Sequence, residues 1–261
     1  MISSLRQLFR RRDLLFMLVW REVKIRYKQS VMGVLWAVLM PAVIVASGIF
    51  VKLAISFVAQ QPFRLDELAQ VSVKAVPWAF FVGSLRFATG SLIANSTLVT
   101  KIYVPREIFP LASTLSQAID FAAAAGVLAV ALTIAGVGAS LHLLWVPVLL
   151  SILVLLTAAI GAITAAGSLF LRDVKYLVEV FVMFAIFFTP VFYDASIFGA
   201  WQSYLLLNPV APILEGLAAT VVRHEAPHPG WILYSTVFAL TAAVLALQLF
   251  NWLDPYFAES I

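Results

Sequence analysis

Two charged side chains, Arg86 and Asp120, lie inside stretches of chain that are otherwise free of charge. An ionised group is costly in a bilayer, so such residues usually pair with each other or line a transport pathway. We favour a mutual salt bridge between Arg86 and Asp120, which would hold two helices together. The alternative is that Arg86 faces a pathway and attracts an anionic group of a substrate.

Aromatic side chains form a second candidate feature. Four phenylalanines recur at intervals of three and four residues and are followed by a tyrosine: Phe181, Phe184, Phe188, Phe192 and Tyr193. The spacing places the phenylalanines on one face of a helix. Such a stripe usually packs against other helices or against lipid. Its functional interpretation is an aromatic lining that contacts the apolar faces of sugar rings. The sequence leaves both open.

Residues for other kinds of chemistry are missing from the sequence. The chain has no cysteine, which excludes thiol nucleophiles, thiolate metal sites and disulfides. His142, His224 and His228 lack metal-ligand spacing. No glycine is followed by lysine, so there is no Gly-x-x-x-x-Gly-Lys nucleotide loop. We therefore expect no catalytic residue, metal or cofactor on this chain.

The elements that position these residues are transmembrane helices. Hydrophobic residues make up 63% of the 261 and charged residues 11%, with a mean hydropathy of +1.01, whereas about a quarter of a soluble chain is charged. Residues 121–171 contain no Asp, Glu, Lys or Arg, which is enough for two spans of about 20 residues. The sequence predicts an all-α integral membrane protein. Its positive charges lie in short loops, which argues against nucleic acid as a partner.

Six spans are predicted, with both termini on one side. Their approximate limits are 31–51, 75–98, 108–135, 143–171, 177–193 and 230–253. Eight Lys and Arg residues precede the first span, and the second and fourth loops add two each. Twelve positive residues therefore lie on one side against four on the other, Lys74 being among the four. Because positive residues stay cytoplasmic, we expect both termini inside.

Two further segments complete the predicted architecture. Residues 1–30 combine a short apolar run with Arg and Lys, the pattern of an amphipathic helix on the inner leaflet with its cations toward phosphates. Residues 195–229 must begin and end outside, and their apolar part is broken at Asn208, Pro209 and Pro212. Such a segment is typical of a re-entrant helical hairpin that lines a pathway. An ordinary outer loop packed on the bundle is the alternative.

Small residues in the fourth span predict close helix packing. Gly161 and Ala165, like Ala162 and Ala166, are four residues apart, which lets another helix approach closely. The spacing leaves open whether that helix belongs to the same chain or to a second copy.

An ordered set of motifs gives the chain a family resemblance. The motifs are WREVKIRYKQS at 20–30, GVLWAVLMP at 33–41, KIYVPREIFP at 101–110, FLRDVKYL at 170–177, PVFY at 190–193 and LNP at 207–209. Together they resemble the ABC-2 type permeases that export lipid-linked polysaccharides such as O-antigen, capsule or teichoic acid. The resemblance implies a single transmembrane domain over 1–261, with an interfacial helix at 1–30, the bundle at 31–253 and a cytoplasmic tail at 254–261.

The resemblance implies a transporter subunit and not an enzyme. Such permeases act in the bacterial inner membrane as homodimers with two copies of a separate ATPase, which binds Mg-ATP. The substrate would be a lipid-linked, O-antigen-like polysaccharide, with teichoic acid or another amphipathic molecule as the alternative. Contacts with the ATPase would lie in two cytoplasmic loops, at Lys101, Tyr103, Pro105, Arg106, Glu107, Arg172 and Asp173.

Two other classes compete with a transporter. An intramembrane lipid-phosphate transferase would need several acidic or histidine groups around a metal, yet Asp120 is the one acid well inside a predicted span. A passive channel would show a ring of polar residues along a pore-facing stripe, which the spans lack.

Overall fold

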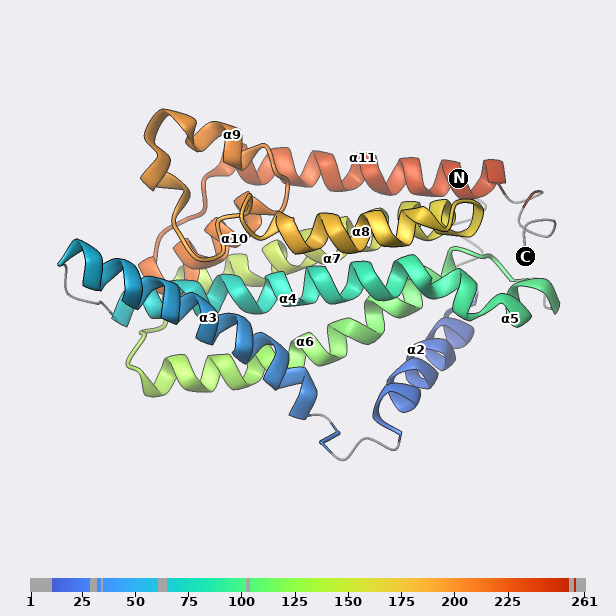
Figure 1. The fold of residues 1–261 in the computed structure, drawn as a ribbon, viewed down its shortest axis with the longest axis horizontal. Helices are drawn as coiled ribbons and strands as arrows, with labels where there is room; N and C mark the ends of the chain where they lie inside the picture. The colour runs from blue at the N-terminus through green and yellow to red at the C-terminus, as the bar shows by residue number, and fades with distance from the viewer. Residues whose placement is uncertain are drawn as a thin grey trace.

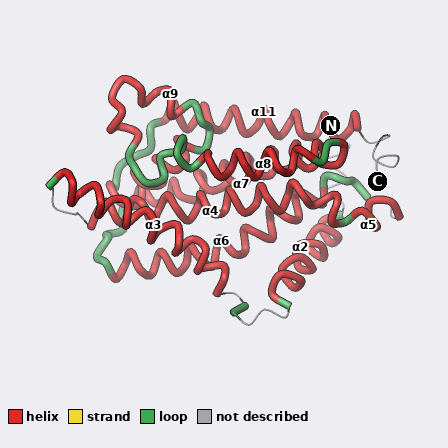
Figure 2. The backbone as a smooth tube through the Cα atoms, in the orientation of Figure 1, coloured by secondary structure: helices red, strands yellow, loops and turns green. Residues whose placement is uncertain are grey.

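A computed structural model describes residues 11–28, 32–33, 35–60, 65–101, 104–253 and 256. Within these ranges the chain is built from helices and loops (Figures 1 and 2), which confirms the predicted all-helical class. Four long helices lie side by side: α4 (Leu65–Ala94), α6 (Ile108–Ile134), α7 (Trp145–Phe170) and α11 (Pro229–Leu253). The helix α4 packs against both α6 and α7, and α11 packs against α7.

Four stretches of helix are long and apolar enough to cross a membrane. They are Asp66–Ala94, Ile108–Ile134, Leu141–Phe170 and Pro229–Leu253, where the third includes a 3-10 turn, Leu141–Leu144, ahead of α7. These stretches correspond to the predicted second, third, fourth and sixth spans. The stretches Leu141–Phe170 and Pro229–Leu253 are apolar runs that no charge interrupts, whereas α4 contains Lys74 and Arg86 and α6 contains Asp120. In a membrane each such helix satisfies its backbone hydrogen bonds internally.

The predicted first and fifth spans take a different form. The helix α3 (Leu35–Ala59) contains Pro41, and its strongly apolar part, Leu35–Val51, is shorter than the four long stretches. The helix α8 (Asp173–Ala185) has 13 residues, which reach about 20 Å against a hydrocarbon core of about 30 Å. From Ile186 to Tyr193 the chain continues through turns. The count of six spans therefore stays a prediction.

The start of α4 differs from the prediction. The helix begins at Leu65 and not near residue 75, with Asp66 and Glu67 in its first turn. Acidic side chains are stabilising there because the N-terminus is the positive end of the helix dipole. Lys74 therefore lies inside the helix and is 1% exposed, so its placement in an outer loop is wrong. A hydropathy pattern predicts the end of a span at a charged residue. The helix α4 continues through Lys74 because Asp194 and Glu215 neutralise its charge.

The N-terminal helix α2 (Arg12–Tyr27) packs against α6 and is inclined to the long helices (Figure 1). An interfacial helix would direct its cations toward lipid phosphates and its apolar side chains toward lipid tails, and α2 follows this division only in part. Arg21 points inward and bonds to Asn95, the residue that follows α4. Glu22 and Arg26 bond to side chains of α6. Phe16 and Trp20 are exposed, as lipid-facing residues should be. The expectation that the arginines of this helix face phosphates is therefore wrong for Arg21 and Arg26.

The bundle has two distinct ends (Figure 1). One, which we call the α5 end, carries α5 (Ser96–Lys101), the first residues of α6 and α8, and the last residues of α11. The other, the α10 end, carries four short helices. These are the 3-10 helix Ala195–Trp201, α9 (Gln202–Leu206), α10 (Ala211–Ala218) and the π-helical turn Ala219–Arg223. The predicted breaks at Asn208 and Pro209 separate α9 from α10, and α10 is buried against α4, α7 and α11.

The small residues of α7 meet α4 of the same chain. Gly161, Ala165 and Ala166 are buried, and a side chain added at Gly161 would come within 2.7 Å of the Ala88 methyl group. The predicted close approach is confirmed, and the partner helix is internal.

Candidate functional site

Asp120 pairs with the N-terminal helix and not with Arg86. One of its carboxylate oxygens accepts a bond from the Arg26 guanidinium, and the other accepts a 2.5 Å hydrogen bond from the Tyr27 hydroxyl. Arg26 also donates to the Ser116 hydroxyl at 2.9 Å. Burial, with the hydrogen bond to Asp120, raises the pKa of Tyr27 to about 12, so the phenol keeps its proton and acts as the donor. The expected Arg86–Asp120 salt bridge is therefore wrong, because Arg26 and Tyr27 of α2 occupy both carboxylate oxygens of Asp120.

A second polar group of α2 is also enclosed. Glu22 accepts hydrogen bonds from the Ser113 and Ser116 hydroxyls at 2.9 and 3.1 Å. Burial raises the pKa of Glu22, while these hydrogen bonds and the charges of Arg26 and Arg21 partly oppose the rise. The polar face of α2 thus attaches the N-terminal helix to α6 through several bonds that leave little of its charge in solvent.

Arg86 lines an open cavity of about 460 Å³ between α2, α3, α4 and α6. Its guanidinium has no carboxylate within ion-pair distance among the residues that the structure describes. The cavity has a polar part formed by Arg26, Arg86, Gln117 and Asp120, and its remaining wall is mostly apolar and aromatic. Arg86 and Asp120 thus share one cavity without touching.

The phenylalanine stripe of α8 divides in two. Phe181, Phe184 and Phe188 are 64%, 51% and 69% exposed and line a groove of about 410 Å³ together with Asn208 and Pro209. The groove therefore joins the aromatic stripe to the predicted break in the 195–229 segment. The predicted common helix face is confirmed for Phe181 and Phe184 of α8, whereas Phe188 lies in the turns after α8 and reaches the groove through the fold, as do Asn208 and Pro209.

The remaining members of the aromatic and hairpin sets have structural contacts. Phe192 is half-buried and packs against Gly48 of α3, so it is separate from the groove. The Tyr193 hydroxyl donates to the Phe187 carbonyl at 2.9 Å. Asn208 donates to the Thr189 hydroxyl at 2.8 Å, and Pro212 is buried in the first turn of α10.

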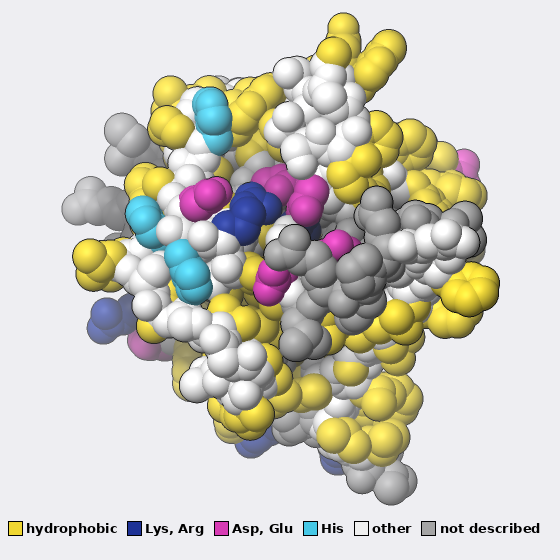
Figure 3. Space-filling model, turned by 90° about the vertical axis from the view of Figure 1, so that its left-hand side faces the viewer, with side chains coloured by type: hydrophobic (Ala, Val, Ile, Leu, Met, Phe, Trp, Pro, Cys, Tyr) yellow, Lys and Arg dark blue, Asp and Glu magenta, His cyan; other side chains and the backbone are white. Residues whose placement is uncertain are grey.

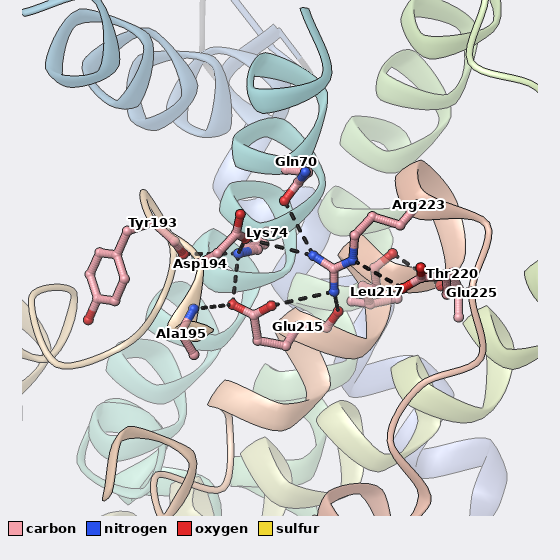
Figure 4. Close-up of polar contacts among 10 residues, drawn as sticks. All are labelled: Gln70, Lys74, Tyr193, Asp194, Ala195, Glu215, Leu217, Thr220, Arg223 and Glu225. Atoms are coloured by element: carbon pink, nitrogen blue, oxygen red, sulfur yellow. Dashed lines mark hydrogen bonds and ion pairs between the residues drawn. The ribbon is translucent and has the colours of Figure 1, made fainter. Parts of the chain in front are cut away.

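A partly buried charge cluster lies at the α10 end (Figure 4). The Lys74 ammonium donates to Asp194 Oδ1 at 2.6 Å, to Glu215 Oε1 at 2.9 Å and to the Tyr193 carbonyl at 2.9 Å. Arg223 lies farther out, 3.8 Å from Asp194 and 3.7 Å from Glu215. We call these four side chains, Lys74, Asp194, Glu215 and Arg223, the Lys74 cluster.

The Lys74 cluster joins three segments that are distant in sequence. Figure 4 shows its side chains converging from α4, from the loop after α8 and from α10 with the π-helical turn that follows. The same end, viewed in Figure 3, shows Lys or Arg side chains with acidic neighbours at the centre and hydrophobic side chains around them. Sequence reasoning missed this site. The sequence feature that could have indicated it is that Lys74 and Glu215 each interrupt a long apolar run and so need a partner of opposite charge.

The predicted ATPase-contact residues gather at the α5 end. Pro105, Arg106 and Glu107 form the turn before α6 and are partly exposed, and Arg172 and Asp173 are exposed where α8 begins. The side chains predicted at Lys101 and Tyr103 lie outside the described residues. The five described residues are thus brought to the same end of the bundle, opposite the Lys74 cluster (Figure 1).

A bundle of membrane-length helices with aromatic and cationic cavities between them is compatible with a membrane transport subunit. Comparison with known families makes this specific. Residues 13–222 match the family of the ABC-2 type transporter, so the chain belongs to that family, and the resemblance drawn from the motifs is confirmed.

Individual relatives align over nearly the whole chain. An O-antigen export system permease protein RfbA from Klebsiella pneumoniae is 28% identical over 95% of this chain and 94% of its own length. A second RfbA from the same organism is 27% identical over the same shares. The RfbA of Myxococcus xanthus is 26% identical over all of both chains.

Proposed function

We propose that this chain is the permease subunit of an ATP-driven exporter that moves a lipid-linked, O-antigen-like polysaccharide outward across the bacterial inner membrane. It would act as a homodimer with two copies of a separate ATPase, with both termini cytoplasmic and no catalytic role of its own. Family membership and the names of its full-length relatives support this proposal. The observation that carries it in the structure is the groove formed by Phe181, Phe184 and Phe188 beside Asn208 and Pro209.

The groove suits a sugar chain for a physical reason. Exposed aromatic rings offer flat apolar faces to the C–H surfaces of sugars, and such contacts tolerate different sugars because they do not read individual hydroxyls. In this proposal α3 and the segment from α8 to Tyr193 complete six spans, and residues 195–229 form a re-entrant hairpin whose Asn208–Pro209 break borders the path. The α5 end then faces the cytoplasm and the ATPase.

The matched test uses phenylalanines of one helix and the turn that follows it. In cells that depend on this chain for export, replacing Phe184 and Phe188 together by Ala should lower surface polysaccharide about tenfold, since each aromatic contact contributes about 0.5–1.5 kcal/mol. Phe187→Ala is the control, because Phe187 is 68% exposed but is not part of the groove. Equal export by the double variant and the control, at equal protein levels, would show that the groove is not the path.

A further inference from the structure

The cavity around Arg86 has an unusual balance of charge. Its charged residues are Arg26, Arg86 and Asp120. Arg26 and Asp120 neutralise each other, and Tyr27 bonds to the second carboxylate oxygen of Asp120. Glu22 is not part of the cavity lining and is bonded to Ser113 and Ser116. Counted over the residues that the structure describes, the cavity lining therefore keeps about one uncompensated positive charge, which Arg86 carries.

The position of Arg86 makes that charge costly. It lies eight residues before the end of α4, about 12 Å along the helix, inside a stretch that is apolar enough to span a membrane. An unpaired arginine at such a depth is unfavourable in the empty protein, and an anion in the cavity would remove the penalty. The planar fork of a guanidinium matches the oxygens of a phosphate in particular.

The rest of the cavity suits an apolar chain. Its wall includes Trp36, Met40, Phe80 and Phe121, and most of its other lining side chains are aliphatic. An apolar cavity of about 150 Å³ holds a benzene molecule, so about 460 Å³ is enough for a chain of many methylene groups. A single ligand that satisfies both parts has a phosphate attached to a hydrocarbon chain.

We propose that the cavity between α2, α3, α4 and α6 binds the phosphate group of a lipid, with Arg86 as the residue that bonds to the phosphate. The Arg26–Asp120 pair then acts as a neutral wall that keeps Asp120 from capturing Arg86. Two sources offer this chemistry, a bilayer phospholipid and the lipid carrier of the polysaccharide. Only the second rests on the proposed function.

The test measures lipid binding to the delipidated protein in detergent by native mass spectrometry. Three probes are compared: dioleoylphosphatidylglycerol, dioleoylglycerol, which has the same chains without phosphate, and farnesyl diphosphate, which has a prenyl chain with diphosphate. The wild type should bind phosphatidylglycerol or farnesyl diphosphate about tenfold more tightly than dioleoylglycerol, because a charge-assisted hydrogen bond contributes at least that factor. Arg86→Gln should abolish the preference.

Two further variants keep the test decisive. Lys175→Gln removes the same charge from an exposed position on α8 and should leave the preference intact. Ala79→Phe fills the cavity without changing its charge and should weaken every probe, which covers the case in which Arg86→Gln fails to fold. Tighter binding of farnesyl diphosphate assigns the site to the carrier, and tighter binding of phosphatidylglycerol assigns it to a bilayer lipid.

Equal affinity of the wild type for phosphatidylglycerol, farnesyl diphosphate and dioleoylglycerol would overturn the proposal, as would unchanged preference in Arg86→Gln. The assay contains neither ATPase nor transport. Loss of the proposed export function would therefore leave this result unaffected.

Discussion

Removing the Lys74 ammonium tests whether the Lys74 cluster holds the α10 end together. The ammonium is 1% exposed and meets three acceptors at 2.6 to 2.9 Å, which are Asp194, Glu215 and the Tyr193 carbonyl. Lys74→Met would leave two partly buried carboxylates with one cation, Arg223, which lies 3.8 Å from Asp194 and 3.7 Å from Glu215. Breaking a buried ion pair in this way costs about 3–5 kcal/mol, which corresponds to a fall in melting temperature on the order of 10 °C.

The assay is thermal unfolding of the purified protein in detergent, followed by intrinsic fluorescence. Lys175→Met, an exposed lysine on α8, is the matched control and should melt within about 2 °C of the wild type, as surface substitutions usually do. Adding Glu215→Gln to Lys74→Met should recover most of the loss, because Asp194 and Arg223, 3.8 Å apart, then balance each other. An unchanged melting temperature for Lys74→Met, or losses of the two single variants that simply add in the double variant, would refute the reasoning.

Three other predictions follow from contacts described above. Arg26→Met and Asp120→Asn should each destabilise the protein by about 2–4 kcal/mol and the double variant by less than their sum, whereas strict additivity would mean that the pair does not interact. Because burial places the pKa of Glu22 above its unfolded value, the stability that its proton provides is present below pH 4.5 and is lost as pH rises through the folded pKa. Glu22→Gln should therefore gain stability relative to the wild type at pH 7 but not at pH 4, and a gain that is the same at both pH values would contradict this. Gly161→Ala should destabilise by about 1–3 kcal/mol because its methyl group would press on α4, while Gly126→Ala, which has open space, should not; melting curves of the two variants decide this.

The sequence was most informative where one property extends over a long stretch. The four membrane-length helices follow from long stretches that are predominantly apolar, and the common face of Phe181 and Phe184 follows from helical spacing. The break between α9 and α10 follows from the local chemistry of Asn208 and Pro209, which disfavour a continuous helix. These features depend on neighbours within a few residues of each other.

The features that sequence reasoning missed depend on distant partners. Arg26 and Asp120 are 94 residues apart, and Lys74 and Glu215 are 141 residues apart. An isolated charge in an apolar run signals that a partner exists but does not identify it. The prediction pairs Arg86 with Asp120 because both lie inside stretches otherwise free of charge, whereas in the structure Arg26 of α2 bonds to Asp120.

Transport in inverted inner-membrane vesicles that contain this chain and the ATPase proposed to act with it gives the most direct test of the proposed function. We predict that labelled lipid-linked polysaccharide enters the vesicle lumen only when both proteins and ATP are present. We also predict that the Phe184→Ala, Phe188→Ala double variant lowers this rate about tenfold while Phe187→Ala does not. Entry at the same rate without ATP, or without this chain, would contradict the assignment of the protein as the permease of an ATP-driven exporter.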